Sequence, residues 1–154
     1  MGEINPSIRI IIAIFSGALA VAFFHEPAIA VCHFLHLTAQ HAYPTDRTIP
    51  LWVPAIASRM FWGGAFGIGV AFATAKHQTG GACFKRAMLF GSIVMSLIAW
   101  LPVEALKGLP LFDGLHVGEM LTTFVANGIW GFGTALLLII FSFATVNLAD
   151  ISLT

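Results

Sequence analysis

The stretch GEMLTTFVANGIWGFGTALLLIIFSFATVNL, residues 118–148, decides the fold class of this chain. No charged residue occurs between Met120 and Leu148. A transmembrane helix needs about 20 mostly apolar residues, because each residue adds about 1.5 Å toward a hydrocarbon core of about 30 Å. The stretch therefore predicts a helix that crosses a membrane.

Three further apolar stretches precede it, at about residues 8–36, 50–75 and 87–102. The chain is 58% hydrophobic and 9% charged, against about 25% charged in an ordinary soluble domain. Four spanning helices use most of the 154 residues, which leaves no room for a soluble domain. We therefore predict an all-α membrane protein in which residues 1–154 form a single four-transmembrane-helix bundle.

Prolines and glycines set the expected helix boundaries. Pro6 fits the first turn of the first helix, and Pro27 leaves two alternatives open: the helix continues past it, or it kinks there. We expect the second helix to begin near Pro50, and residues 76–86 to form a polar loop. Pro102 is expected to end the third helix.

The chain also has features of a tandem repeat of helical hairpins, with residues 1–78 as one copy and residues 79–154 as the other. A Trp-Gly pair occurs in the second stretch at Trp62 and again in the fourth at Trp130. Two helices per copy would place the axis that relates the copies along the membrane normal. The alternative is coincidence, because apolar segments rich in Gly and Phe resemble one another.

Orientation is inferred from the basic residues near the helix ends, because Lys and Arg favour the cytoplasmic side. On the predicted topology, four of them fall on the side of the termini and three on the other. The four are Arg9, Lys76, Lys85 and Arg86, and the three are Arg47, Arg59 and Lys107. We therefore expect cytoplasmic N and C termini in a membrane of the bacterial inner-membrane type.

Small residues on the second and fourth helices predict close helix packing. Gly63 and Gly67 lie one turn apart, and Gly128 and Gly131 provide similar bare backbone in the fourth helix. Lipid gives no hydrophobic incentive for helices to associate, so close backbone approach must supply it. We expect the second and fourth helices to pack together, within one chain or between copies of a homo-oligomer.

Arg59 is the most costly residue to place in this membrane domain. It lies near the outer end of the second helix, where a guanidinium must find a partner or extend to the interface. Glu26, Glu104 and Glu119 are candidate partners at similar depth, and Asn127 occupies the matching place in the other hairpin. Together they predict a buried polar cluster, which is either an ion or solute pathway or a structural anchor.

A second candidate site rests on histidines and a cysteine. If the helix continues past Pro27, then His25, Cys32 and His36 share one face, and His116 could complete the set from the fourth helix. Imidazole and thiolate are reasonable ligands for zinc or copper. Haem fits less well, since the second and third helices carry no histidine within the bilayer. The alternative is that these side chains only face the headgroup zone.

Motifs for catalysis are missing, since there is no His-Glu-x-x-His helix, nucleophile elbow or phosphate-binding loop. A net charge of zero without a basic tract argues against nucleic acid as a partner. The leading hypothesis is a non-catalytic membrane protein that forms a homo-oligomeric small-solute or ion pathway. The alternatives are a metal- or haem-binding redox or sensor protein, and an accessory subunit of a larger membrane complex.

Overall fold

The computed structural model describes residues 5–48 and 52–151, with side chains as far as residue 147. The described part contains four helices that are long and apolar enough to cross a membrane. They are Pro6–Phe34, Ala55–Ala73, Gly80–Lys107 and Val117–Asn147. The chain is thus a multi-pass integral membrane protein, and the predicted all-α class with four spanning helices is confirmed.

Several of these helices consist of consecutive segments that differ in hydrogen-bond pattern. In chain order the elements are α1 (Pro6–Ala20), the π-helical η1 (Val21–His25), α2 (Glu26–Phe34), β1 (Arg47–Thr48), β2 (Val53–Pro54), α3 (Ala55–Ala73), α4 (Gly80–Leu89), the π-helical η2 (Phe90–Met95), α5 (Ser96–Ile98), the π-helical η3 (Ala99–Val103), α6 (Glu104–Lys107), the short 3₁₀ segment η4 (Phe112–Leu115) and α7 (Val117–Ile151).

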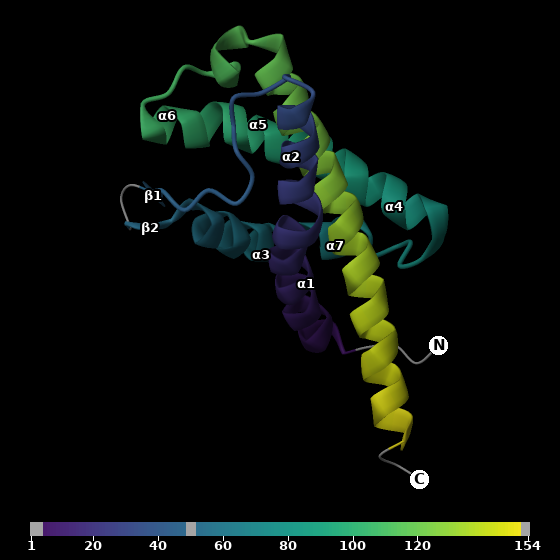
Figure 1. The fold of residues 1–154 in the computed structure, drawn as a ribbon. Helices are drawn as coiled ribbons and strands as arrows, with labels where there is room; N and C mark the ends of the chain where they lie inside the picture. Colours follow the sequence, from purple (N-terminus) through teal and green to yellow (C-terminus); the bar gives the residue numbers. More distant parts are fainter. Residues whose placement is uncertain (1–4, 49–51, 152–154) are drawn as a thin grey trace.

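The helices form two hairpins, in which α1–α2 packs against α3 and the helix from α4 to α6 packs against α7 (Figure 1). The continuous helix α1–α2 runs alongside α7 in the opposite direction, while α3 and the helix from α4 to α6 cross behind them. The beginning of α1 and the end of α7 lie at the same end of the molecule.

The first helix continues through Pro27, which settles the alternative that the sequence left open. Its start is capped by the Asn5 side chain, which accepts a hydrogen bond from the Ser7 backbone N–H. Immediately before Pro27 the helix widens into η1, where the Glu26 N–H bonds to the carbonyl of Val21, five residues earlier. A π turn relieves the clash between a proline ring and the preceding turn.

The third helix is longer than predicted at both ends. It begins at Gly80, inside the expected polar loop 76–86, and it ends at Lys107, where Gly108 adopts a left-handed φ of 66°. The prediction that Pro102 ends this helix is wrong, because the π-helical segment η3 accommodates the proline ring within the helix.

The second helix begins later than predicted. Residues 49–51, which include the expected start near Pro50, lie outside the described residues. On either side of them, β1 and β2 pair antiparallel, with Thr48 opposite Val53. This short pairing occupies the chain up to Pro54, so α3 starts at Ala55.

The glycines of α3 and α7 lie at helix contacts, mostly between the two helices of one hairpin; Gly63 of α3 also lies close to the Trp130 indole of α7. A Cβ on Gly67 would meet the carbonyl oxygen of Ala13 in α1, and a Cβ on Gly131 would meet that of Ala87 in α4. Gly63 likewise lies against Val21 and Gly128 against Ser92, in the first and third helices. The small residues therefore join mainly the two helices of each hairpin, and the expected packing of the second helix against the fourth occurs at Gly63 and Trp130.

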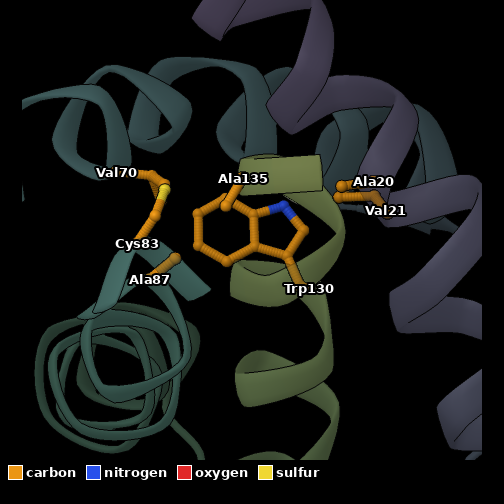
Figure 2. Close-up of a cluster of buried hydrophobic side chains, with 7 residues drawn as sticks. All are labelled: Ala20, Val21, Val70, Cys83, Ala87, Trp130 and Ala135. Atoms are coloured by element: carbon orange, nitrogen blue, oxygen red, sulfur yellow. The ribbon is translucent and has the colours of Figure 1, made fainter. Parts of the chain in front are cut away.

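Trp130 fills the centre of the molecule, where all four spanning helices meet (Figure 2). Its side chain on α7 is 2% exposed, and its indole N–H donates to the Gly17 carbonyl of α1 at 2.9 Å. The surrounding cluster consists of Ala20, Val21, Val70, Cys83, Ala87 and Ala135. A single bulky ring surrounded by small residues thus holds the two hairpins together.

Candidate functional site

Residues 35–46, which we call the strap, connect α2 to β1. They carry much of the polar hydrogen bonding at the end of the molecule opposite the start of α1. They have no regular secondary structure. The strap contacts one carboxylate on α2 and another on α7. It therefore crosses the helices at the end opposite the start of α1.

Glu26 and Arg59 form an ion pair beneath the strap. Glu26 is the first residue of α2 and its side chain is 0% exposed, whereas Arg59, on α3, is 30% exposed. One guanidinium nitrogen of Arg59, Nη1, lies 2.9 Å from Oε1 and 3.2 Å from Oε2 of Glu26. Nδ1 of His25 lies 3.1 Å from the same Oε1. Of the three candidate partners named from the sequence, Glu26 is the one that pairs with Arg59.

Tyr43 fastens the strap to this pair in two ways. Its backbone N–H donates to Oε2 of Glu26 at 2.6 Å, and its hydroxyl donates to the Ala22 carbonyl at 2.8 Å. That carbonyl needs a partner, because the Glu26 N–H already bonds to Val21 and Pro27 has no N–H to offer. The π turn before Pro27 therefore creates the acceptor that the tyrosine uses.

Glu119, in the first turn of α7, anchors the other half of the strap. Its carboxylate accepts hydrogen bonds from the Ala39 N–H at 2.7 Å, from the Thr38 hydroxyl and from Nε2 of Gln40 at 3.3 Å. The amide oxygen of Gln40 in turn accepts from Nη2 of Arg59 at 3.4 Å. Gln40 thus joins the two carboxylates of the predicted cluster through the arginine.

The other two members of the predicted cluster lie elsewhere. Glu104 accepts from the Asp113 backbone N–H at 3.2 and 3.3 Å, and the carboxylate of Asp113 accepts from the Trp100 indole at 2.7 Å. Asn127 donates to Ser96 at 3.1 Å. Both residues bond within the second hairpin, so the sequence-predicted set divides into a group around Arg59, Glu104 beside Asp113, and Asn127 beside Ser96.

The predicted metal ligands are not brought together. Among residues 5–48 and 52–151, no three His, Cys, Asp or Glu side chains are grouped so that they could hold a metal ion. The helix ends at Phe34, and His36 has a left-handed φ of 57°, so the helical spacing that aligned His36 with His25 and Cys32 does not apply. Cys32 is buried as a free thiol.

Sequence reasoning missed the contribution of the strap. Thr38, Gln40 and Tyr43 lie in irregular chain, where no periodicity indicates which way a side chain points. Two of the strongest contacts also come from backbone N–H groups, which every residue except proline possesses. Only the depth of the two carboxylates, Glu26 and Glu119, carried a signal.

A shallow groove of about 330 Å³ lies beside this site, between the first helix and α7. Its lining is almost entirely apolar and consists of Phe23, Phe24, Pro27, Ala28, Val31, Cys32, Val125 and Ile129. The groove lies at the level of the spanning helices, where hydrocarbon surrounds the protein. It therefore offers no polar route to the ion pair.

No family model, curated protein or solved structure matches this chain. Interpretation of the site therefore depends on its geometry. The site places one positive and two negative side chains at one end of the four spanning helices, covered by a segment that is hydrogen-bonded to both carboxylates.

Proposed function

We propose that the chain is a pathway for a small solute or ion, with Glu26 and Arg59 as its charged site and the strap as the segment that covers it. The observation that carries this proposal is the ion pair itself. Removing a carboxylate and a guanidinium from water costs several kcal/mol per ion, and apolar residues of similar volume are often at least as stable. Ionisable groups at this depth are by default candidates for function.

The strap supplies the second argument. Its contacts with the carboxylates are hydrogen bonds to Thr38, Ala39, Gln40 and Tyr43, each of which water can replace. Net stabilisation from such bonds is modest, about 0.5–1.5 kcal/mol each and more where a charged group takes part. Opening the strap would expose Arg59 further and uncover Glu26, and a small anion could then compete with Glu26 for the guanidinium.

The test is flux through purified protein in liposomes, with chloride, potassium and glycerol as the probes. We expect at least one probe to cross faster than in protein-free liposomes, and Arg59→Gln to reduce that flux at least tenfold. Arg86→Gln changes an exposed arginine on α4 and should leave the flux unchanged. Equal flux in wild type, Arg59→Gln and empty liposomes would refute the pathway.

An accessory subunit of a larger membrane complex is the second candidate. The observation that favours it is the saturation of Glu26, whose oxygens accept from His25, Tyr43 and Arg59 within the chain. Such a carboxylate is suited to a structural role. This function predicts no flux, together with stable co-purification of other membrane chains when the protein is expressed at its native level.

The proposed location is a membrane of the bacterial inner-membrane type, with cytoplasmic termini. The support is the small excess of Lys and Arg on that side. Homo-oligomer formation is a separate proposal, and it must use surfaces other than Gly67 and Gly131, which are covered within the chain. Accessibility of single cysteines in intact cells tests the orientation, and light scattering in detergent tests the oligomer.

A further inference from the structure

Two histidines that sequence reasoning did not combine lie against each other where the strap leaves α2. His33 is in the last turn of α2 and His41 is in the strap. Their ring centroids are 4.3 Å apart and their planes are tilted by 49°. The rings come from different segments, so the folding of the strap over the helix end brings them together.

The hydrogen bond of His33 fixes the role of each of its ring nitrogens. Nδ1 lies 3.1 Å from the carbonyl oxygen of Thr38. A carbonyl can only accept, so Nδ1 carries the proton and Nε2 of the neutral ring keeps its lone pair. In most metal-binding histidines one ring nitrogen binds the metal and the N–H of the other donates to a carboxylate or a backbone carbonyl, as Nδ1 does here.

His41 can supply the second ligand. Its side chain is exposed, so it can turn about its side-chain bonds at small cost. The ring centroids are only 4.3 Å apart, so after such a rotation one ring nitrogen of His41 and Nε2 of His33 can face a common point. A metal ion at about 2.0–2.1 Å from each nitrogen would fit such a point.

We propose that His33 and His41 bind one divalent transition ion, such as Cu²⁺, Zn²⁺ or Ni²⁺, with water as the remaining ligands. Imidazole suits these ions, and Cu²⁺ is expected to bind most tightly of the three. With two ligands from the protein, the affinity is lower than that of a four-ligand structural site. The bound ion would hold the strap to the end of α2.

This site differs from the one expected at His25, Cys32, His36 and His116, and it does not depend on the proposed pathway. The strap is otherwise held by Glu119 through Thr38 and by Glu26 through Tyr43. A metal bridge at His41 lies between these two anchor points in the sequence. It would therefore add a restraint between Gln40, which Glu119 holds, and Tyr43, which Glu26 holds.

The experiment is Cu²⁺ titration of the full-length protein in detergent, purified without a polyhistidine tag. Calorimetry should give one ion per chain, and electron paramagnetic resonance should show coupling to two imidazole nitrogens. His41→Ala should weaken binding at least tenfold, whereas His77→Ala, in the loop at the opposite end, should not change it.

Two outcomes would overturn this site. One is the absence of saturable Cu²⁺ binding to the wild-type protein. The other is a His41→Ala or His41→Asn variant that retains its helical circular dichroism and binds Cu²⁺ as tightly as wild type. Since both readouts use protein without a membrane gradient, failure of the pathway would leave them unaffected.

Discussion

At the residue scale, Glu26 connects three separate parts of the chain. It joins its neighbour His25, Arg59 on α3 and the backbone of Tyr43 in the strap. A fully buried carboxylate with these partners is stable only while they remain, because an unpaired charge in such a place is far more costly than a neutral side chain.

The ion pair can be tested by a double-mutant cycle. Glu26→Gln and Arg59→Gln should each lower the free energy of unfolding by about 3 kcal/mol. This value is at the lower end of the range for breaking a buried ion pair, because Arg59 is partly exposed. The double variant should lose less than the sum of the two. Unfolding in mixed micelles with increasing SDS measures these changes, and purely additive losses would contradict a direct interaction.

Tyr43 allows a smaller test at the same scale. Its backbone has a left-handed φ of 54°, which is unfavourable for a tyrosine and must be held by its contacts. Tyr43→Phe leaves the Ala22 carbonyl without its partner, so we expect a loss of roughly 1 kcal/mol. Hydrogen exchange should become faster in the strap and stay unchanged in α7. Unchanged exchange in the strap would show that the hydroxyl has no such role.

At the scale of elements, close backbone approach holds each hairpin together. Gly67 of α3 packs against Ala13 and Gly17 of α1, and a Cβ added at Gly17 or Gly67 would meet backbone atoms of the other helix. Backbone cannot turn aside as a flexible side chain can. Helix association in lipid depends on such close packing, so these positions tolerate little added volume.

Gly67→Ala should therefore separate α1 from α3 and lower the free energy of unfolding by about 1–3 kcal/mol. Gly81→Ala is the matched control, since a Cβ there meets no atom within 4 Å. In the first turn of α4 it should be neutral or slightly stabilising. Equal stability of the two variants in SDS unfolding would refute the packing argument.

The sequence predicts the number of spanning helices better than their ends or the partners of their polar side chains. Long apolar stretches predicted four helices correctly, because hydrocarbon permits few alternatives. Helix ends were less predictable: Pro102 indicated a stop, yet a π turn accommodates it, and no sequence pattern distinguishes these outcomes. Depth limited the partners of Arg59 to three carboxylates but did not select Glu26. The partner of Glu104 depends on loop geometry at Asp113, and that of Asn127 on helix packing against Ser96.

At the scale of the whole molecule, the contacts of the two hairpins have the same spacing. In the first, Gly17 lies against the Gly63 carbonyl, and in the second Gly91 lies against that of Asn127. The pairs Gly67–Ala13 and Gly131–Ala87 follow one turn away. By their contacts, Gly67 of the first hairpin corresponds to Gly131 of the second. Alignment of the two Trp-Gly pairs in the sequence instead makes Gly63 correspond to Gly131, so the two alignments differ by one helical turn. Duplication remains a prediction, now with a defined register.

If the hairpins are equivalent units, each should fold without a covalent link to the other. We predict that residues 1–78 and 79–154, expressed as separate chains, both insert into the membrane and co-purify. The break falls in the loop before α4, and the cluster around Trp130 supplies the contact between the halves. Rapid degradation of both halves when expressed together would argue against independent units.

The position of Arg59 on a later helix than Glu26 also has a consequence for biosynthesis. The acidic residue leaves the ribosome first and meets hydrocarbon without its counter-charge until α3 has been made. We therefore expect insertion to proceed by hairpins, with the first helix waiting at the translocon. A released chain truncated before residue 55 should remain extractable by alkali, and one truncated after residue 75 should resist extraction. Equal resistance of the two would show that Glu26 enters the bilayer unaided.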